Sequence, residues 1–288
     1  MMRLTLFILL QALGCGWLEL PAPREQDSLL LCRTHYAALD TCTHVRNYSL
    51  LYDPATFASC WVAYPLCRAH LAAGREDSWA YDPSLPDSLQ TGVFKNYSTE
   101  RFRTEHYKSN YYARGHQIPN ADRNASVSMQ AQTYYATNMT PQIQNGFNGL
   151  IWAKLEKGLR DAALTCPDTL YLVTGASLRR ADLPDSTQTL QYVVNRNDGK
   201  RLPVPWWYWK AALKVRRDSL GRIEDAGSIA FFLPHRDLKG HQFSEYAVSV
   251  DSLEVLTGFD LFPALPDSIE VKCEQSSSWK DFLGFEKK

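Results

Sequence analysis

The sequence predicts a mixed α+β fold, with a central sheet of mainly antiparallel strands and helices on its flanks. Apolar runs of strand length lie on both sides of a polar central stretch at residues 111–156. Apolar residues recur at helical spacing over residues 144–160. The chain has 288 residues, of which 45% are hydrophobic and 22% charged, so it can bury the core that such a fold needs.

The first fifteen residues are typical of an export signal. Arg3 precedes an apolar run at residues 4–10, which is too short to cross a bilayer as a permanent helix. Residues 12–15, Ala-Leu-Gly-Cys, resemble a bacterial lipobox, which predicts a lipid anchor on Cys15 and a periplasmic or cell-surface location. Secretion without lipid and a buried N-terminal helix are the alternatives.

The cysteine count agrees with export. Seven cysteines are present, and six remain if Cys15 carries lipid, an even number that can pair completely in an oxidising compartment. Proximity along the chain favours three disulfides: Cys32 with Cys42, Cys60 with Cys67, and Cys166 with Cys273. Buried thiols are the alternative. A structural zinc site is not expected, because the sequence contains no pair of cysteines separated by two residues.

The remaining elements follow in order. Residues 16–43 are expected to form a polar spacer with a short element bounded by cysteines, and residues 44–288 a single domain. Two strands are predicted on either side of the turn at Asp53 and Pro54, and a loop at residues 79–89. After the helix at residues 144–160, we expect strands at residues 169–175, 203–215 and 228–233, a helix at residues 249–259, and a proline-broken end.

The charge balance restricts how this protein can bind a polyanion. Its formal net charge is zero, so no global positive field attracts nucleic acid or anionic membrane, and binding must use a local patch. The central stretch offers one, with His116 near Arg114 and Arg123. A neutral imidazole near pH 7 is a natural general base, and arginine suits phosphate. A surface histidine without a catalytic role is the alternative.

Asn148 and Glu156 add the residues of a cation site. They lie eight residues apart, a little over two helical turns, and therefore roughly on one side of the predicted helix. A neutral amide oxygen suits Mg²⁺, which keeps most of its waters, and a carboxylate can orient metal-bound water. A helix cap and a solvated glutamate are the alternatives for the two residues taken singly. Jointly with His116 they predict metal-assisted hydrolysis of a phosphodiester.

Four short motifs in the central stretch carry a family resemblance. They are Tyr-Ala-Arg-Gly-His at residues 112–116, Ala-Asp-Arg at 121–123, Asn-Met-Thr-Pro-Gln at 138–142, and Asn148 with Trp152 and Glu156. They resemble the signature of the DNA/RNA non-specific endonucleases of the ββα-metal class, and the likeness covers about residues 44–272. The resemblance implies that His116 is the general base and that Asn148 is the direct ligand of a single divalent ion. It further implies that Glu156 holds metal-bound waters and that Arg114 supports the phosphate.

The resemblance also suggests supporting residues. Asn138 and Gln142 match family positions that support the site, Asn138 among the catalytic groups and Gln142 on the substrate side with Arg123. The upstream phosphate-binding arginine of the family is matched first by Arg103 and second by Arg101. One position departs from the family pattern, because Ala113 stands where an Asp usually precedes Arg-Gly-His. If that acid orients the base or supports the hydrated metal, its loss alters activity, pH dependence or metal preference.

We therefore expect a sequence-non-specific endonuclease that hydrolyses DNA, RNA or both, uses Mg²⁺, with Mn²⁺ or another divalent ion as an alternative, and leaves 5′-phosphates. The resemblance further suggests a homodimer. Two other classes remain open: a catalytically weak surface lipoprotein that binds nucleic acid, and a periplasmic phosphodiesterase for small substrates. The aromatic run at residues 206–209 could stack bases, but packing in the core is the favoured interpretation.

Overall fold

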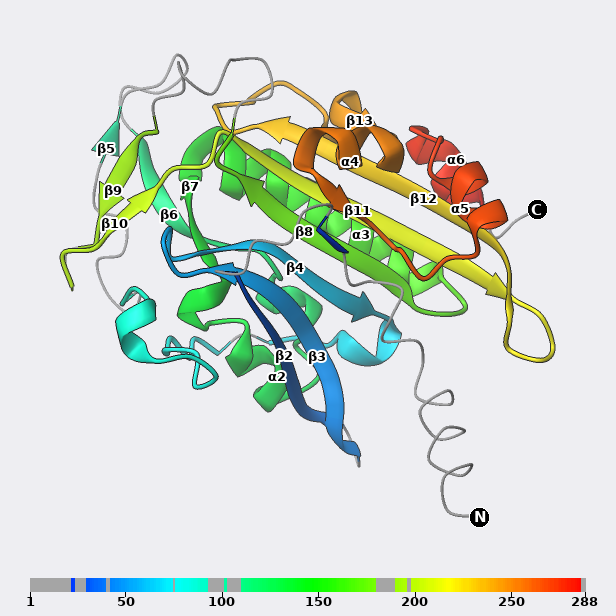
Figure 1. Cartoon of the computed structure of the whole chain (residues 1–288), viewed down its shortest axis with the longest axis horizontal. Coiled ribbons are helices and arrows are strands. Elements are labelled where there is room, and N and C mark those ends of the chain that lie inside the picture. The colour runs from blue at the N-terminus through cyan, green and yellow to red at the C-terminus, as the bar shows by residue number, and fades with distance from the viewer. Residues whose placement is uncertain are drawn as a thin grey trace.

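The computed structural model describes residues 22–23, 30–39, 42–74, 76–92, 101–102, 110–179, 190–195 and 198–285. Its centre is a seven-stranded antiparallel sheet in the order β13-β12-β11-β8-β4-β3-β2 (Figure 1). The strands are β2 (Leu31–Leu39), β3 (Cys42–Asp53), β4 (Ala58–Leu66), β8 (Leu170–Ser177), β11 (Trp207–Arg217), β12 (Ile223–Pro234) and β13 (Ala247–Val248). The predicted α+β class, with a mainly antiparallel sheet, is confirmed.

Helices cover both faces of this sheet, as Figure 1 shows. On one face, α3 (Ala153–Thr165) places Leu155 and Leu159 in a buried cluster with Tyr208 of β11. On the other face, α4 (Val250–Thr257) and α5 (Asp267–Cys273) cover a second cluster that includes Trp209. Neighbouring residues of β11 therefore enter different cores, which explains why this strand is apolar on both sides. The core role favoured for the aromatic run is confirmed for Tyr208 and Trp209.

A separate three-stranded sheet carries the central stretch. It has the order β5-β6-β7, in which β6 (Asn110–His116) pairs antiparallel with β7 (Met139–Ile143). From β7 the chain passes into the helical segment η5 (Gln144–Trp152) and continues as α3. The order strand, strand, helix therefore brings residues 110–116 beside residues 144–156.

The other elements are short. None of the helices in the described part of the chain is long and apolar enough to cross a membrane. The short strands and helices are β1 (Ala22–Pro23), β5 (Arg101–Phe102), β9 (Tyr192–Val194), β10 (Arg201–Pro203), β14 (Phe259–Asp260), α2 (Val127–Gln132) and α6 (Trp279–Gly284).

The predicted strands and the two predicted helices are present, but the spacer prediction was wrong for residues 31–39. This segment is the edge strand β2, paired antiparallel with β3. Its buried face carries His35, whose Nε2 lies 3.0 Å from Oδ2 of the buried Asp82. A polar residue on the inner face hides the alternation by which a strand is recognised in a sequence. The proline-broken end also differs from expectation, because helix α5 begins at Asp267.

Strand geometry rules out two of the three predicted disulfides. Cys42 pairs with Leu39, seven residues along β2 from Cys32. Cys60 and Cys67 are also seven residues apart, along β4 and just beyond its end. Seven extended residues span about 23 Å, whereas disulfide-bonded Cα atoms lie within about 7 Å. Neither pair can close without breaking the sheet.

The third predicted disulfide, between Cys166 and Cys273, is also wrong, because both residues are thiols in the structure. Cys166 follows α3 on one face of the sheet, and Cys273 is buried in the cluster on the other face. Burial, followed by the charge of Glu274, raises the pKa of the Cys273 thiol to about 12. Cys273 is thus an inert buried thiol, which was the alternative interpretation.

Candidate active site

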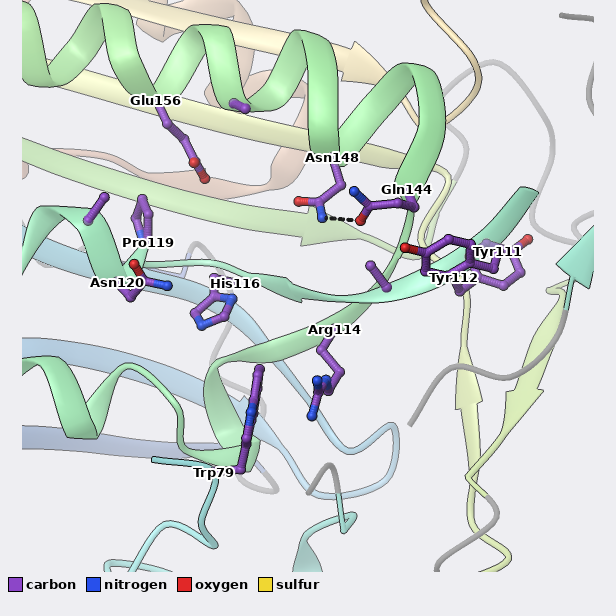
Figure 2. Close-up of a pocket in the computed structure, with 13 residues that line it drawn as sticks. Trp79, Tyr111, Tyr112, Arg114, His116, Pro119, Asn120, Gln144, Asn148 and Glu156 are labelled. Atoms are coloured by element: carbon purple, nitrogen blue, oxygen red, sulfur yellow. Dashed lines mark hydrogen bonds between the residues drawn. The ribbon is translucent and has the colours of Figure 1, made fainter. Parts of the chain in front are cut away.

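A cleft of about 550 Å³ opens between β6 and the helix that runs from η5 into α3. Four of the residues singled out in the sequence line it: Arg114, His116, Asn148 and Glu156. Figure 2 shows His116 on one side of this space, and Asn148 and Glu156 on the other. The structure therefore brings together side chains that are up to 42 residues apart in the sequence.

Strand β6 positions Arg114 and His116. Alternate residues of a strand point to one face, so the two side chains share a face while Gly115 between them points to the other. A Cβ at Gly115 would lie 2.4 Å from the side chain of Gln142 on β7, so glycine here leaves the space that this side chain occupies. The His116 ring packs against Trp79 and Tyr134, with centroids 5.6 and 5.2 Å away.

The helical side of the cleft is fixed to β6 by a reciprocal amide contact. The Asn110 side chain accepts a hydrogen bond from the Asn145 backbone N–H at 2.9 Å and donates one to the Asn145 carbonyl at 2.8 Å. Gly146 then turns the chain with φ of +84°, and a Cβ there would lie 2.0 Å from Oδ1 of Asp237. These contacts set where η5 begins, and with it the position of Asn148.

The orientation of the Asn148 amide is held by one hydrogen bond. Its Nδ2 donates to Oε1 of Gln144 at 2.9 Å, four residues earlier and on the other side of the kink at Asn145 and Gly146. In Figure 2 the amide nitrogen therefore faces Gln144, and the amide oxygen faces the side of the cleft where Glu156 lies. The oxygen, the atom that can bind a cation, is the one left turned into the cleft.

Glu156 lies in an electrostatic setting that favours the protonated form. Burial raises the pKa of its carboxyl to about 7, and the charge of Asp122 adds to this, whereas Lys210 and Arg160 oppose it. Lys210 is 1% exposed, and burial lowers its pKa to about 8. Arg160 Nη1 donates to Asp122 Oδ1 at 2.8 Å. The charges of two cations and a second carboxylate thus act on Glu156, and of these three groups Lys210 and Asp122 are buried while Arg160 is partly exposed.

Arg114 is supported by an aromatic residue that the sequence did not reveal. Its guanidinium lies 3.7 Å from the centroid of the Trp79 ring, a cation–π arrangement that restrains the charge at the cleft. Trp79 begins the segment that was expected to be only a loop. A tryptophan in a polar Pro-Asp-Ser stretch was the available signal. Gln144 was also missed, and helical spacing could not reveal it, because the kink at Asn145 and Gly146 separates it from the helix of Asn148.

The structure does not support a phosphate-binding role for Arg123. The side chain is 0% exposed. Its Nε donates to Asn47 Oδ1 at 2.6 Å, and its Nη2 donates to the backbone carbonyls of Asn47 and Pro65 at 2.8 Å. A guanidinium used in this way links loops to the sheet and cannot reach a phosphate in solvent.

Asn138 and Gln142 also lie outside the cleft lining. Asn138 is fully buried, and its Nδ2 donates to the carbonyls of Ile118 and Thr133 while its Oδ1 accepts from the Ile118 N–H. It therefore holds the turn after His116 from outside the cleft lining, and its catalytic role stays a prediction. Gln142 is fully buried beside Gly115, so the expected substrate contact is corrected.

Four further positions complete the comparison with the sequence. Arg103 and Cys15 lie outside the described residues, and of Arg101 only the backbone is described. Ala113 lines the cleft, opposite Gln142 in the β6–β7 ladder. Among the described residues that line the cleft, Glu156 is the one carboxylate.

Comparison with known proteins identifies the family. Residues 32–268 match the sequence model of the DNA/RNA non-specific endonucleases. The mitochondrial nuclease of Saccharomyces cerevisiae is 28% identical over 251 residues, which cover 78% of this chain and 75% of that protein. A nuclease of Serratia marcescens is 28% identical over 230 residues, which cover 77% of this chain and 75% of that protein. The mitochondrial nuclease EXOG of Danio rerio is 28% identical over 224 residues, 76% of this chain but 60% of that protein.

The fold agrees with this assignment. A crystal structure of the EndoG/EndoGI complex aligns with a TM-score of 0.62 and 19% identity, covering 83% of this chain and 88% of that chain. The family match begins at residue 32, within β2, and extends into α5. Because the match covers most of the chain and the fold is shared, the protein belongs to the DNA/RNA non-specific endonuclease family.

Proposed function

We propose that the protein is a divalent-metal-dependent endonuclease that hydrolyses phosphodiester bonds of DNA, RNA or both without sequence preference. One observation carries the proposal: His116, Asn148 and Glu156 line a single cleft, with His116 facing the other two residues across it. Arg114 lies in the same cleft beside His116. The set provides a base, oxygen ligands for a cation, and a positive group for phosphate.

The residues of the cleft fit a hard divalent cation. The amide oxygen of Asn148 is turned into the cleft because the amide nitrogen is held by Gln144. With the Glu156 carboxylate it forms an all-oxygen donor set, and no cysteine is among the described residues that line the cleft. Mg²⁺ or Mn²⁺ suits such a set, since these ions prefer oxygen and retain several waters. The bound cation would stabilise negative charge on a phosphate oxygen and on the leaving 3′ oxygen.

Each protein group then has a defined task. His116 accepts a proton from the attacking water, and Asn148 and Glu156 hold and orient the hydrated cation. Arg114, restrained over Trp79, binds a non-bridging phosphate oxygen. Attack by water opposite the 3′ oxygen leaves a 5′-phosphate on the product.

The lack of sequence preference follows from what the cleft offers to the substrate. Contacts made to phosphate carry no sequence information, so we expect binding to depend on the nucleic-acid backbone. Because the net charge of the protein is zero, affinity must come from this local contact and should fall steeply as salt rises.

The test is degradation of plasmid DNA and of RNA with Mg²⁺ or Mn²⁺, and with EDTA. His116→Ala and Asn148→Ala should each lower the rate by about 100-fold or more. His241→Ala is the matched control, because His241 is exposed on the surface and lies outside the cleft. Equal, metal-independent degradation by the wild type and both cleft variants would overturn the proposal.

We also propose export, with a lipid on Cys15, from the sequence of residues 1–15. Cell fractionation tests the anchor. Cys15→Ala should move the protein from the membrane to the soluble fraction, and an unchanged distribution would remove the anchor from the account.

A further inference from the structure

Three carboxylates converge where α4 meets α5, on the sheet face opposite α3. They are Asp251 and Glu254 on α4 and Glu274 at the C-terminal end of α5, and one oxygen of each lies within 4.8 Å of the others. The Asp251 N–H also donates to the Glu274 carbonyl at 3.3 Å. We call these three residues the α4–α5 acidic site. Its helices cover the second buried cluster and supply none of the residues of the nuclease cleft.

Glu274 is unusual within this site because it is buried and lacks a partner. It is 2% exposed, and its Oε1 has no hydrogen-bond partner in the described structure. A buried carboxylate oxygen without a partner destabilises the folded chain, because it has lost its hydrogen bonds to water. Glu254 differs, because its Oε1 accepts a hydrogen bond from the Leu261 N–H at 2.6 Å. The arrangement around Glu274 is therefore incomplete without a proton or a cation.

The neighbouring carboxylates add to the cost of ionising Glu274 in this position. Burial raises the pKa of Glu274 to about 9, and Glu254, Glu270 and Asp251 add to the effect in that order. The nearest basic residue on α5, Lys272, is directed elsewhere, with its Nζ 3.2 Å from Asp225 Oδ1. Negative charge thus accumulates at the helix junction while the adjacent lysine neutralises a different carboxylate.

We propose that Asp251, Glu254 and Glu274 bind a hard divalent cation of the Ca²⁺ type that ties α4 to α5. All three donors are carboxylate oxygens. The set lacks the histidine and cysteine ligands that are typical of a structural zinc site. Oxygens on opposite sides of Ca²⁺ lie about 5 Å apart, so separations within 4.8 Å fit one such ion. Asp251 is exposed and gives the ion a route from solvent, whereas Glu254 and Glu274 are buried. The inference does not depend on the proposed nuclease function.

The site predicts a stabilising effect of Ca²⁺. A ligand that binds only the folded chain raises the unfolding temperature as its concentration exceeds Kd. At about 100 times Kd we expect a rise of roughly 5 °C for a chain of this size. The helices tied by the ion pack over the second buried cluster, so the effect should appear in global unfolding.

The experiment uses the full chain with Asn148→Ala, which removes the proposed catalytic ligand, so that Ca²⁺ is measured away from the cleft. Isothermal titration should find one Ca²⁺ per chain at neutral pH, and thermal unfolding should show the rise. Glu274→Gln and Asp251→Asn in this background should each weaken binding at least about tenfold and, at the same Ca²⁺ concentration, reduce the rise to about half or less. Asp281 is an exposed residue on α6, so Asp281→Asn is the matched control. It should change neither the Ca²⁺ affinity nor the rise in unfolding temperature.

Two results would overturn the inference. One is the absence of Ca²⁺ binding in the Asn148→Ala chain, and the other is equal binding by the Glu274→Gln and Asp251→Asn variants. Because Asp251 is exposed, Asp251→Asn tests the site even if Glu274→Gln fails to fold. A Glu274→Gln chain that is as stable as its parent, with no response of either to Ca²⁺, would identify a protonated Glu274 in place of a metal ligand.

Discussion

Replacing Arg123 and Arg114 separately by lysine distinguishes a structural arginine from one that binds phosphate. Both changes keep the positive charge and remove the planar fork of donors. At Arg123 the fork donates to four acceptors: Asn47 Oδ1 at 2.6 Å, and the carbonyls of Asn47, Pro65 and Asp122 at 2.8 Å. A lysine ammonium is a single point at the end of a flexible stem, so it cannot reach acceptors spread around that fork.

The size of the destabilisation by Arg123→Lys follows from the number of acceptors that lose a partner. If the ammonium satisfies two of the four, two buried acceptors remain unpaired, each costing about 1–3 kcal/mol. We therefore expect Arg123→Lys to lower the free energy of unfolding by about 3 kcal/mol. For a chain of this size, that corresponds to a fall of roughly 5 °C in Tm. Arg114→Lys should leave stability within about 0.5 kcal/mol of the wild type, because Arg114 lies at the cleft surface.

Urea unfolding and DNA binding at several salt concentrations separate the two roles. Arg123→Lys should be destabilised but bind DNA with the wild-type salt slope at temperatures where it is folded. Arg114→Lys should fold normally but bind or cleave DNA less well, because the stacked, bidentate contact is lost. An Arg123→Lys variant with wild-type stability and a smaller salt slope would refute the structural role assigned to Arg123.

Three further predictions concern the surroundings of the cleft. His235 Nε2 accepts from the Ile143 N–H at 2.8 Å, and burial lowers the pKa of its imidazole to about 4. Since the unfolded chain is protonated first, the contribution of His235 to stability should be constant above about pH 6.5 and fall towards pH 4, by up to about 1.4 kcal/mol per pH unit. Urea midpoints should show a shallower fall for His235→Gln, and equal slopes would contradict the assignment. Gly115→Ala puts a Cβ 2.4 Å from Gln142 and should cost about 1–3 kcal/mol in urea unfolding. Wild-type stability would show that the Gln142 side chain can move aside at no cost. Ala113→Asp adds a carboxylate to the cleft and should lower the Mg²⁺ concentration for half-maximal cleavage about tenfold. An unchanged metal titration would mean that this position lies too far from the cation.

The sequence predicted the parts of the site that depend on local spacing. Arg114 and His116 occupy alternate positions of one strand, and Asn148 and Glu156 share one side of a helix, so their relation follows from the periods of these elements. The resemblance to the endonucleases then placed the two segments in one site. The structure agrees, since all four residues line one cleft.

The misassigned residues depend on contacts between segments far apart in the sequence. Arg123 lies seven residues from His116 in the sequence, but it donates to Asn47 of β3 and Pro65 of β4, which lie far from it in the sequence. Trp79 reaches Arg114 from a loop 35 residues earlier, and no local pattern signals that contact. A short polar motif predicts which residue types gather in a region, but burial decides which of them can meet a ligand.

The charges behind Glu156 were also not predictable. Lys210 stands between apolar residues of β11, and a lysine is usually directed to solvent. The sheet instead buries it against the ring of Trp152, 4.7 Å from the centroid, with its Nζ donating to the Gln117 carbonyl at 3.2 Å. Only the packing of α3 over β11 reveals that the carboxylate and the lysine influence each other's pKa.

The most direct test of the account is single-turnover cleavage of an end-labelled oligonucleotide duplex in Mg²⁺, with analysis of the product ends. The wild type should cut at many positions and leave 5′-phosphates. His116→Gln, which keeps a polar side chain but cannot act as the base, should be about 10²–10⁴-fold slower. Cleavage by His116→Gln at the wild-type rate, or products with 5′-hydroxyl ends, would contradict the assignment of this cleft as the hydrolytic site.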